Sequence, residues 1–97
     1  MKVNLTASSR RDPRDWHNIF VRDSIDRFLF EHDIKEQSNI RLALLSEKHI
    51  DVFANWLNSK GFAVTVWKLD LGSDGKVFGL DFNEHNEYYI EAKLKYV

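Results

Sequence analysis

The sequence predicts a single α+β domain over residues 1–97, in which two main helices pack on one face of a small, largely antiparallel sheet. Three observations support this prediction. The chain has 97 residues and is 43% hydrophobic, which is enough for one modest core. Two segments have apolar residues at helical spacing, and the C-terminal half alternates short apolar runs with turn residues. The expected order of elements is α-β-α-β-β-β.

The first helix is expected from about Pro13 to about His32. Asp12 is a suitable N-cap, and Pro13 suits the first helical position because its missing N–H would have no partner there. Before this helix, Val3 and Leu5 alternate with polar residues and belong either to an edge strand or to a loose arm.

Apolar residues form two stripes on this helix, on nearly opposite sides at about 100° per residue. The wider, aliphatic stripe is expected to face the core and consists of Val21, Ile25, Phe28 and Leu29. The second stripe consists of Trp16, Ile19 and Phe20. Three explanations are open: the helix breaks near residues 21–23, it is packed on both sides, or its second stripe contacts a partner.

Residues 40–45 alternate and predict a short strand, with a helix as the alternative. Ser46 is the expected cap of the second helix. Its apolar face has regular helical spacing and consists of Ile50, Phe53, Ala54 and Leu57. Gly61 is expected to end this helix in a left-handed conformation, with Phe62 as the accompanying hydrophobic contact.

The C-terminal half is expected to form an antiparallel meander. A strand over residues 64–71 leads through a tight turn at 72–75 into a returning strand over 76–82. A second turn at 83–86 precedes a last strand over 88–97.

Composition excludes several classes of function. The chain has no cysteine, which excludes disulfides, thiol nucleophiles and thiolate metal sites. No apolar run approaches the ~18 residues that span a bilayer, and the first residues do not have the pattern of a secretory signal, so we expect a cytoplasmic location. Four scattered histidines lack metal-site spacing, and no glycine loop opens a helix. We therefore predict no metal, no cofactor and no catalytic residue.

Most of the negative charge lies between residues 70 and 91, which hold six carboxylates and one lysine, whereas the whole chain has a net charge of −1. Carboxylates two residues apart on a strand are ~6.6 Å apart, close to the spacing of successive phosphates in nucleic acid. This segment is either an ordinary solvated surface or a mimic of nucleic acid that contacts the basic surface of a nucleic-acid-binding protein or complex. No membrane and no direct nucleic-acid contact are expected. The candidate partner-binding residues are Asp70, Asp74, Asp81, Glu84 and Glu87.

The first helix adds further candidate contacts. Asp15 and Asp26 lie on one line at the helical period, and Asp33 continues that line. Trp16 and Phe20 are candidate anchors, because aromatic side chains often dominate interface energies. Core packing is the alternative for both aromatic residues.

An enzymatic alternative rests on Asp81 and on the triplet Glu91-Ala92-Lys93. If both segments are strands, Glu91 and Lys93 share one face, where they can bind a divalent ion and place an ammonium beside a phosphate. In letters this set resembles the motif of PD-(D/E)xK nucleases, which would make the protein a metal-dependent nuclease. Leu80 stands where that family has proline.

The chain as a whole is similar in character to the small inhibitors of bacteriophages and mobile elements. It is short, has no cysteine, contains 13% aromatic residues and has its acid concentrated in one segment. In these features it resembles anti-CRISPR proteins that block the nucleic-acid site of a surveillance complex. The resemblance implies a noncatalytic inhibitor that blocks access of target DNA, and it assigns no residue. A housekeeping interaction module is the other noncatalytic alternative.

Overall fold

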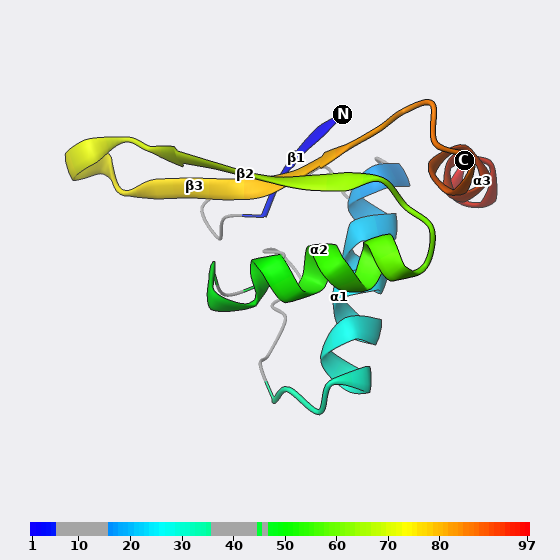
Figure 1. Cartoon of the computed structure of the whole chain (residues 1–97), viewed down its shortest axis with the longest axis horizontal. Coiled ribbons are helices and arrows are strands. Elements are labelled where there is room, and N and C mark those ends of the chain that lie inside the picture. The colour runs from blue at the N-terminus through cyan, green and yellow to red at the C-terminus, as the bar shows by residue number, and fades with distance from the viewer. Residues whose placement is uncertain (6–15, 36–44, 46) are drawn as a thin grey trace.

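A computed structural model describes residues 1–5, 16–35, 45 and 47–97. These residues form an α+β fold with three helices and a three-stranded antiparallel sheet, in the order β-α-α-β-β-α (Figure 1). The predicted α+β class is confirmed, and the order differs at both ends of the chain. The elements are β1 (Lys2–Asn4), α1 (Trp16–Glu31), α2 (Ile50–Ser59), β2 (Val64–Asp70), β3 (Lys76–Phe82) and α3 (Glu87–Tyr96).

The sheet has the order β1-β3-β2, with α1 and α2 on the same side of it (Figure 1). The hairpin of β2 and β3 is confirmed, and its turn is a short 3-10 segment, Gly72–Asp74. The N-terminal residues form an edge strand, because β1 pairs with β3 from Lys2 opposite Asp81 to Asn4 opposite Gly79. A Cβ at Gly79 would collide with the carbonyl oxygen of Val3, so only glycine lets β1 approach this closely.

The predicted last strand is wrong, because residues 87–96 form helix α3. Asn86 caps this helix: its side-chain oxygen accepts hydrogen bonds from the N–H groups of Tyr88 and Tyr89, at 2.9 and 3.1 Å. Glu87 lies in the first turn, and lysines lie in the last turn, where each charge suits the helix dipole. The two tyrosines and Ile90 have high strand propensity, and this local preference is outweighed by the cap and by tertiary packing.

Helix α1 is continuous and is packed on both sides, which decides among the three explanations for its two stripes. The aliphatic stripe is buried as predicted, with Phe28 fully enclosed. Phe20, from the second stripe, is 7% exposed. Its ring centroid lies 5.8 Å from that of Tyr96 in α3 and 5.5 Å from that of Phe62. Helix α3 thus covers the side of α1 that was a candidate partner surface.

The C-terminal ends of α1 and α2 each have a left-handed residue with the same pair of hydrogen bonds. After α2, Gly61 has a φ of 107°, its N–H bonds to the carbonyl of Asn58, and the N–H of Phe62 bonds to that of Leu57. This is the predicted glycine stop. After α1 the same position is held by Asp33, with a φ of 51°. Asp33 therefore lies beyond α1 rather than on its acidic line.

The buried face predicted for α2 is confirmed in all four positions. Several other predictions lie outside the described residues: the helix start at Asp12 and Pro13, the contact at Asp15, the cap at Ser46, and the strand over 40–45 apart from the buried Leu45. None of the helices in the described part of the chain has the length and apolar character needed to cross a membrane.

Candidate functional site

The predicted acidic surface is divided into two groups by the fold. Asp70 and Asp74 form a hairpin group at the turn between β2 and β3, and Asp81, Glu84 and Glu87 form a corner group between the end of β3 and the start of α3. The hairpin turn and α3 lie at opposite ends of the longest dimension of the molecule, which is 39 Å (Figure 1). The five carboxylates therefore do not form one contiguous surface.

Two carboxylates of the corner group bind the amino group of Met1. This amino group lies 3.1 Å from the Oδ1 atom of Asp81 and 3.7 Å from the Oε1 atom of Glu84, and it donates to the carbonyl oxygen of Phe82 at 2.6 Å. The hydroxyl of Tyr89 donates to the sulfur of Met1. Burial raises the pKa of Tyr89, and the negative charge of Glu84 raises it further. Asp81 and Glu84 are therefore partly neutralised within the molecule.

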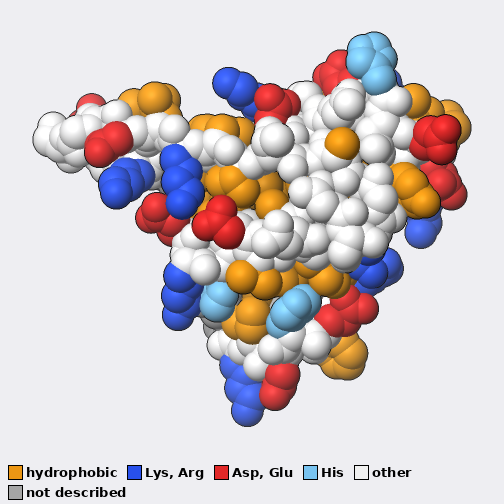
Figure 2. All heavy atoms as spheres, in the orientation of Figure 1, with side chains coloured by type: hydrophobic (Ala, Val, Ile, Leu, Met, Phe, Trp, Pro, Cys, Tyr) orange, Lys and Arg blue, Asp and Glu red, His pale blue; other side chains and the backbone are white. Residues whose placement is uncertain are grey.

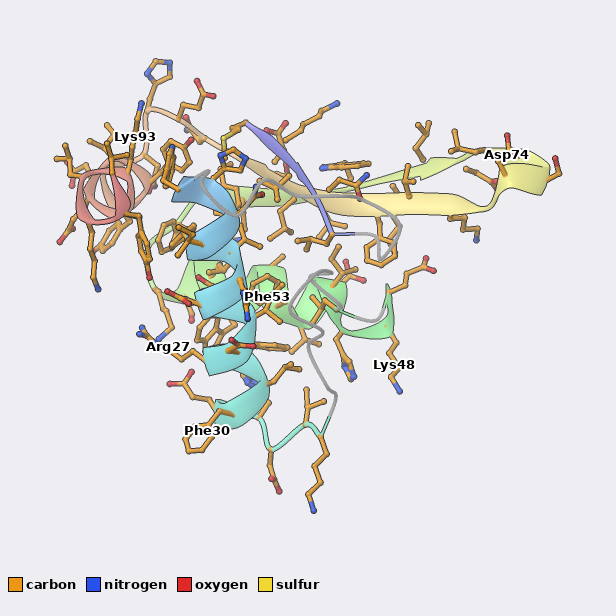
Figure 3. The ribbon with its side chains drawn as sticks, turned by 180° about the vertical axis from the view of Figure 1, so that it is seen from behind. Arg27, Phe30, Lys48, Phe53, Asp74 and Lys93 are labelled. Carbon is orange, nitrogen blue, oxygen red and sulfur yellow. The ribbon has the colours of Figure 1, made fainter. Side chains whose placement is uncertain are left out.

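The hairpin group has a different environment. The Oδ1 atom of Asp70 accepts a hydrogen bond from the backbone N–H of Gly72 at 2.9 Å, which orients the side chain at the start of the turn. Asp74 points outward from the end of the hairpin (Figure 3). Within the described residues, neither carboxylate has an ion-pair partner within 4.0 Å. In the described part of the chain, therefore, no cation neutralises these carboxylates at ion-pair distance, although Lys76 lies opposite Asp70 in the strand pairing.

Apolar side chains accompany these carboxylates. Leu69 is 53% exposed and Leu71 is 45% exposed. We call Leu69, Asp70, Leu71 and Asp74 the hairpin tip. The ribbon that carries the tip extends for about 20 Å, given seven residues in each strand. It is held to the helical body near its middle, where the ammonium of Lys68 lies 3.9 Å from carboxylate oxygens of Glu47 and Asp51.

The leucines of the tip were missed by the sequence interpretation, although a signal was present. In β2 the helix-facing positions begin with the buried Val64 and include Lys68, so the alternate positions, Trp67 and Leu69, face the other side. A strand with apolar residues on both faces has one apolar face left for a partner or for solvent. The indole N–H of Trp67 donates to the carbonyl of Leu80 at 3.1 Å, which orients its ring on that outer side.

The candidate contacts on α1 have three different fates. Phe20 is part of the core and is therefore not available as a contact for a partner. Trp16 is half-buried, with its ring centroid 5.4 Å from that of Tyr89. Asp26 is exposed to solvent, but it already has an interaction partner within the protein. The structure therefore does not join these residues to the hairpin tip in a single surface.

The geometric basis of the nuclease alternative is absent. Glu91 and Lys93 lie on helix α3. Residues two positions apart on a helix are about 200° apart around its axis, so these two side chains point in nearly opposite directions. Lys93 is exposed to solvent on α3. Asp81 is in contact with Met1. Within the described ranges, no three histidine, aspartate or glutamate side chains are placed to hold one metal ion.

Charges of both signs lie side by side over the face of the molecule shown in Figure 2, including the part formed by the hairpin. This pattern is typical of an ordinary solvated surface. The hairpin tip therefore differs from the rest of this face in its projecting shape and not in its density of charge.

The chain matches no protein-family model, no curated protein and no solved structure.

Proposed function

We propose that this protein is a noncatalytic inhibitor that places its hairpin tip in a basic cleft of a nucleic-acid-binding protein. The observation that carries the proposal is the β2–β3 ribbon, which projects beyond α2 and ends in two exposed leucines and two carboxylates without ion-pair partners among the described residues (Figures 1 and 3).

The chemistry of the tip suits a site that normally holds phosphates. A cleft that binds nucleic acid is lined with lysine and arginine, which attract Asp70 and Asp74 over a distance set by the ionic strength. Such attraction mainly accelerates association and selects the partner. Leu69 and Leu71 add apolar area, which is what most stabilises a complex once water is excluded.

The proposed class of partner is supported by the composition of the chain. The resemblance in size and composition to anti-CRISPR proteins favours a surveillance complex, with target DNA as the ligand that is displaced. A housekeeping partner with a basic surface would contact the same residues. The two alternatives differ in whether DNA and this protein compete for the partner.

The test uses three forms of the protein as baits in a bacterial lysate: wild type, the hairpin variant Asp70→Asn/Asp74→Asn, and the corner variant Glu84→Gln/Glu87→Gln. Both double variants remove two charges and keep the side-chain shape. We expect the wild type and the corner variant to capture one stoichiometric partner, and the hairpin variant to capture much less of it. Equal capture by the hairpin variant contradicts the proposal.

Two further measurements on the captured complex define the partner class. Duplex DNA should release the partner, because both ligands occupy the same basic cleft. The association rate should fall as salt rises from 0.1 M to 1 M, because the Debye length shortens from about 10 Å to about 3 Å. A complex that resists both DNA and salt would rule out nucleic-acid mimicry by this hairpin.

A further inference from the structure

A groove with a volume of about 270 Å³ lies between α1 and α3 and is also lined by the C-terminal turn of α2. It is remote from the hairpin tip, since α3 and the hairpin turn lie at opposite ends of the molecule (Figure 1). Each helix turns one face into it: Phe20, Asp23 and Arg27 of α1 are separated by three or four residues, as are Tyr88, Glu91 and Lys95 of α3.

The floor of the groove is apolar and largely aromatic. Phe20, Leu57 and Ala92 are buried beneath it, with exposures of 7%, 1% and 8%. Phe62 and Tyr88 continue this surface, with ring centroids 6.0 Å apart. A planar apolar group can pack against the exposed parts of these rings, because offset and edge contacts with a further ring are favourable.

Three cations from three different elements line the rim: Arg27 of α1, Lys60 after α2, and Lys95 of α3. The ammonium of Lys60 lies 4.5 Å from the ring centroid of Trp56, and that of Lys95 lies 5.9 Å from that of Tyr96. Arg27 projects from α1 on the side where α3 lies (Figure 3). None of the three has a carboxylate within 4.0 Å among the described residues.

Two carboxylates also line the groove, and one of them is already engaged. The hydroxyl of Tyr96 donates to the Oδ2 atom of Asp23 at 3.0 Å. Burial raises the pKa of Tyr96, the hydrogen bond and charge of Asp23 raise it further, and the charge of Arg27 opposes them. Glu91 is the other carboxylate. Cations therefore outnumber carboxylates among the residues that line the groove, and no carboxylate in the described ranges takes up the parallel donors of the Arg27 guanidinium.

We propose that this groove binds a small aromatic acid, with the ring of the ligand on the aromatic floor and its carboxylate at the rim beside Arg27. The size of the groove supports this class. A volume of about 270 Å³ lies just below the range of roughly 300–1,000 Å³ that is typical of ligand sites, which suits a single or fused ring with one short acidic arm. A planar carboxylate matches the fork of a guanidinium better than it matches a single ammonium.

The test titrates the isolated protein with 2-naphthoate as the probe and follows backbone amide shifts by NMR. Saturable shifts confined to α1, the end of α2 and α3 are expected, with one site and a Kd of about 1 mM or tighter. The neutral isostere 2-naphthamide should bind about tenfold more weakly, because it lacks the charge that Arg27 recognises. Absence of saturable shifts, or equal binding of acid and amide, overturns the proposal.

A matched pair of variants on α1 separates a specific contact from general attraction. Arg27→Gln should weaken naphthoate binding about tenfold. Arg22→Gln removes the same charge from an exposed position that does not line the groove, about 140° away around the helix, and should leave the Kd unchanged. Both side chains are exposed, so both variants should keep the melting temperature of the wild type. Equal weakening by the two variants overturns the assignment of Arg27.

Discussion

Replacing Phe20 with alanine should destabilise the isolated protein about as strongly as replacing Phe28. The two residues belong to different stripes of α1, yet both are enclosed, with exposures of 7% and 0%. The ring of Phe20 lies among those of Phe62, Phe82 and Tyr96, so its removal leaves a cavity at the junction of the sheet with α3.

The magnitude follows from the area that is buried. A phenylalanine side chain buries ~200 Å² in a core, and at ~25 cal/mol per Å² this area contributes about 4–5 kcal/mol as an upper estimate. Large-to-small substitutions of buried phenylalanine cost about 3–5 kcal/mol. Because a domain of this size has a total stability of roughly 5–15 kcal/mol, each variant should be close to unfolding at room temperature or melt at least about 12 °C lower.

The assay is thermal and urea unfolding followed by far-ultraviolet circular dichroism. Phe30 provides the matched control, because it lies on the same helix and is 86% exposed. Phe30→Ala should change the free energy of unfolding by less than about 0.5 kcal/mol. If Phe20→Ala melts within the range of Phe30→Ala while Phe28→Ala is strongly destabilised, the packing of α3 on α1 is wrong.

Three further predictions concern the strand contact, the helix ends and the response to pH. Gly79→Ala should cost at least about 1–3 kcal/mol in urea unfolding, because its Cβ meets the carbonyl of Val3; a neutral effect would contradict the pairing of β1. Asp33→Gly should raise the free energy of unfolding by about 0.4–1 kcal/mol, because glycine adopts a positive φ without strain. Asn86→Ala should lower it by about 0.5–2 kcal/mol, because the cap of α3 is lost. The opposite sign in either variant would refute the described helix end. Burial raises the pKa of Tyr89 above its value in the unfolded chain, so its contribution to stability is complete below about pH 10 and is lost as pH rises through the folded pKa. Urea midpoints should fall from pH 9 to pH 11, and Tyr89→Phe should reduce that fall; an unchanged pH dependence would count against the buried hydroxyl.

Local signals in the sequence were sufficient for a large part of the fold. Three features depend only on residues that are close together in the sequence: the apolar face of α2, the glycine at its end and the β2–β3 hairpin. Hydrophobic periodicity and turn residues are therefore enough to predict them. The error at α3 is of a different kind. Asn86, Glu87 and the lysines near the C-terminus are a helix signal, and the period-two interpretation gave more weight to Tyr88 and Tyr89.

The location of the acidic groups and of the second stripe was decided only by the tertiary structure. Asp74 and Glu87 are close in the sequence, but β3 lies between them, so they are at opposite ends of the molecule. The amino group of Met1 meets Asp81, 80 positions away, which no local pattern indicates. Phe20 is buried because α3 returns to cover it, and the packing partner of an amphipathic helix is a property of the whole fold. The sequence determined which residues are apolar and charged, and the path of the chain determined which of them remain available to a partner.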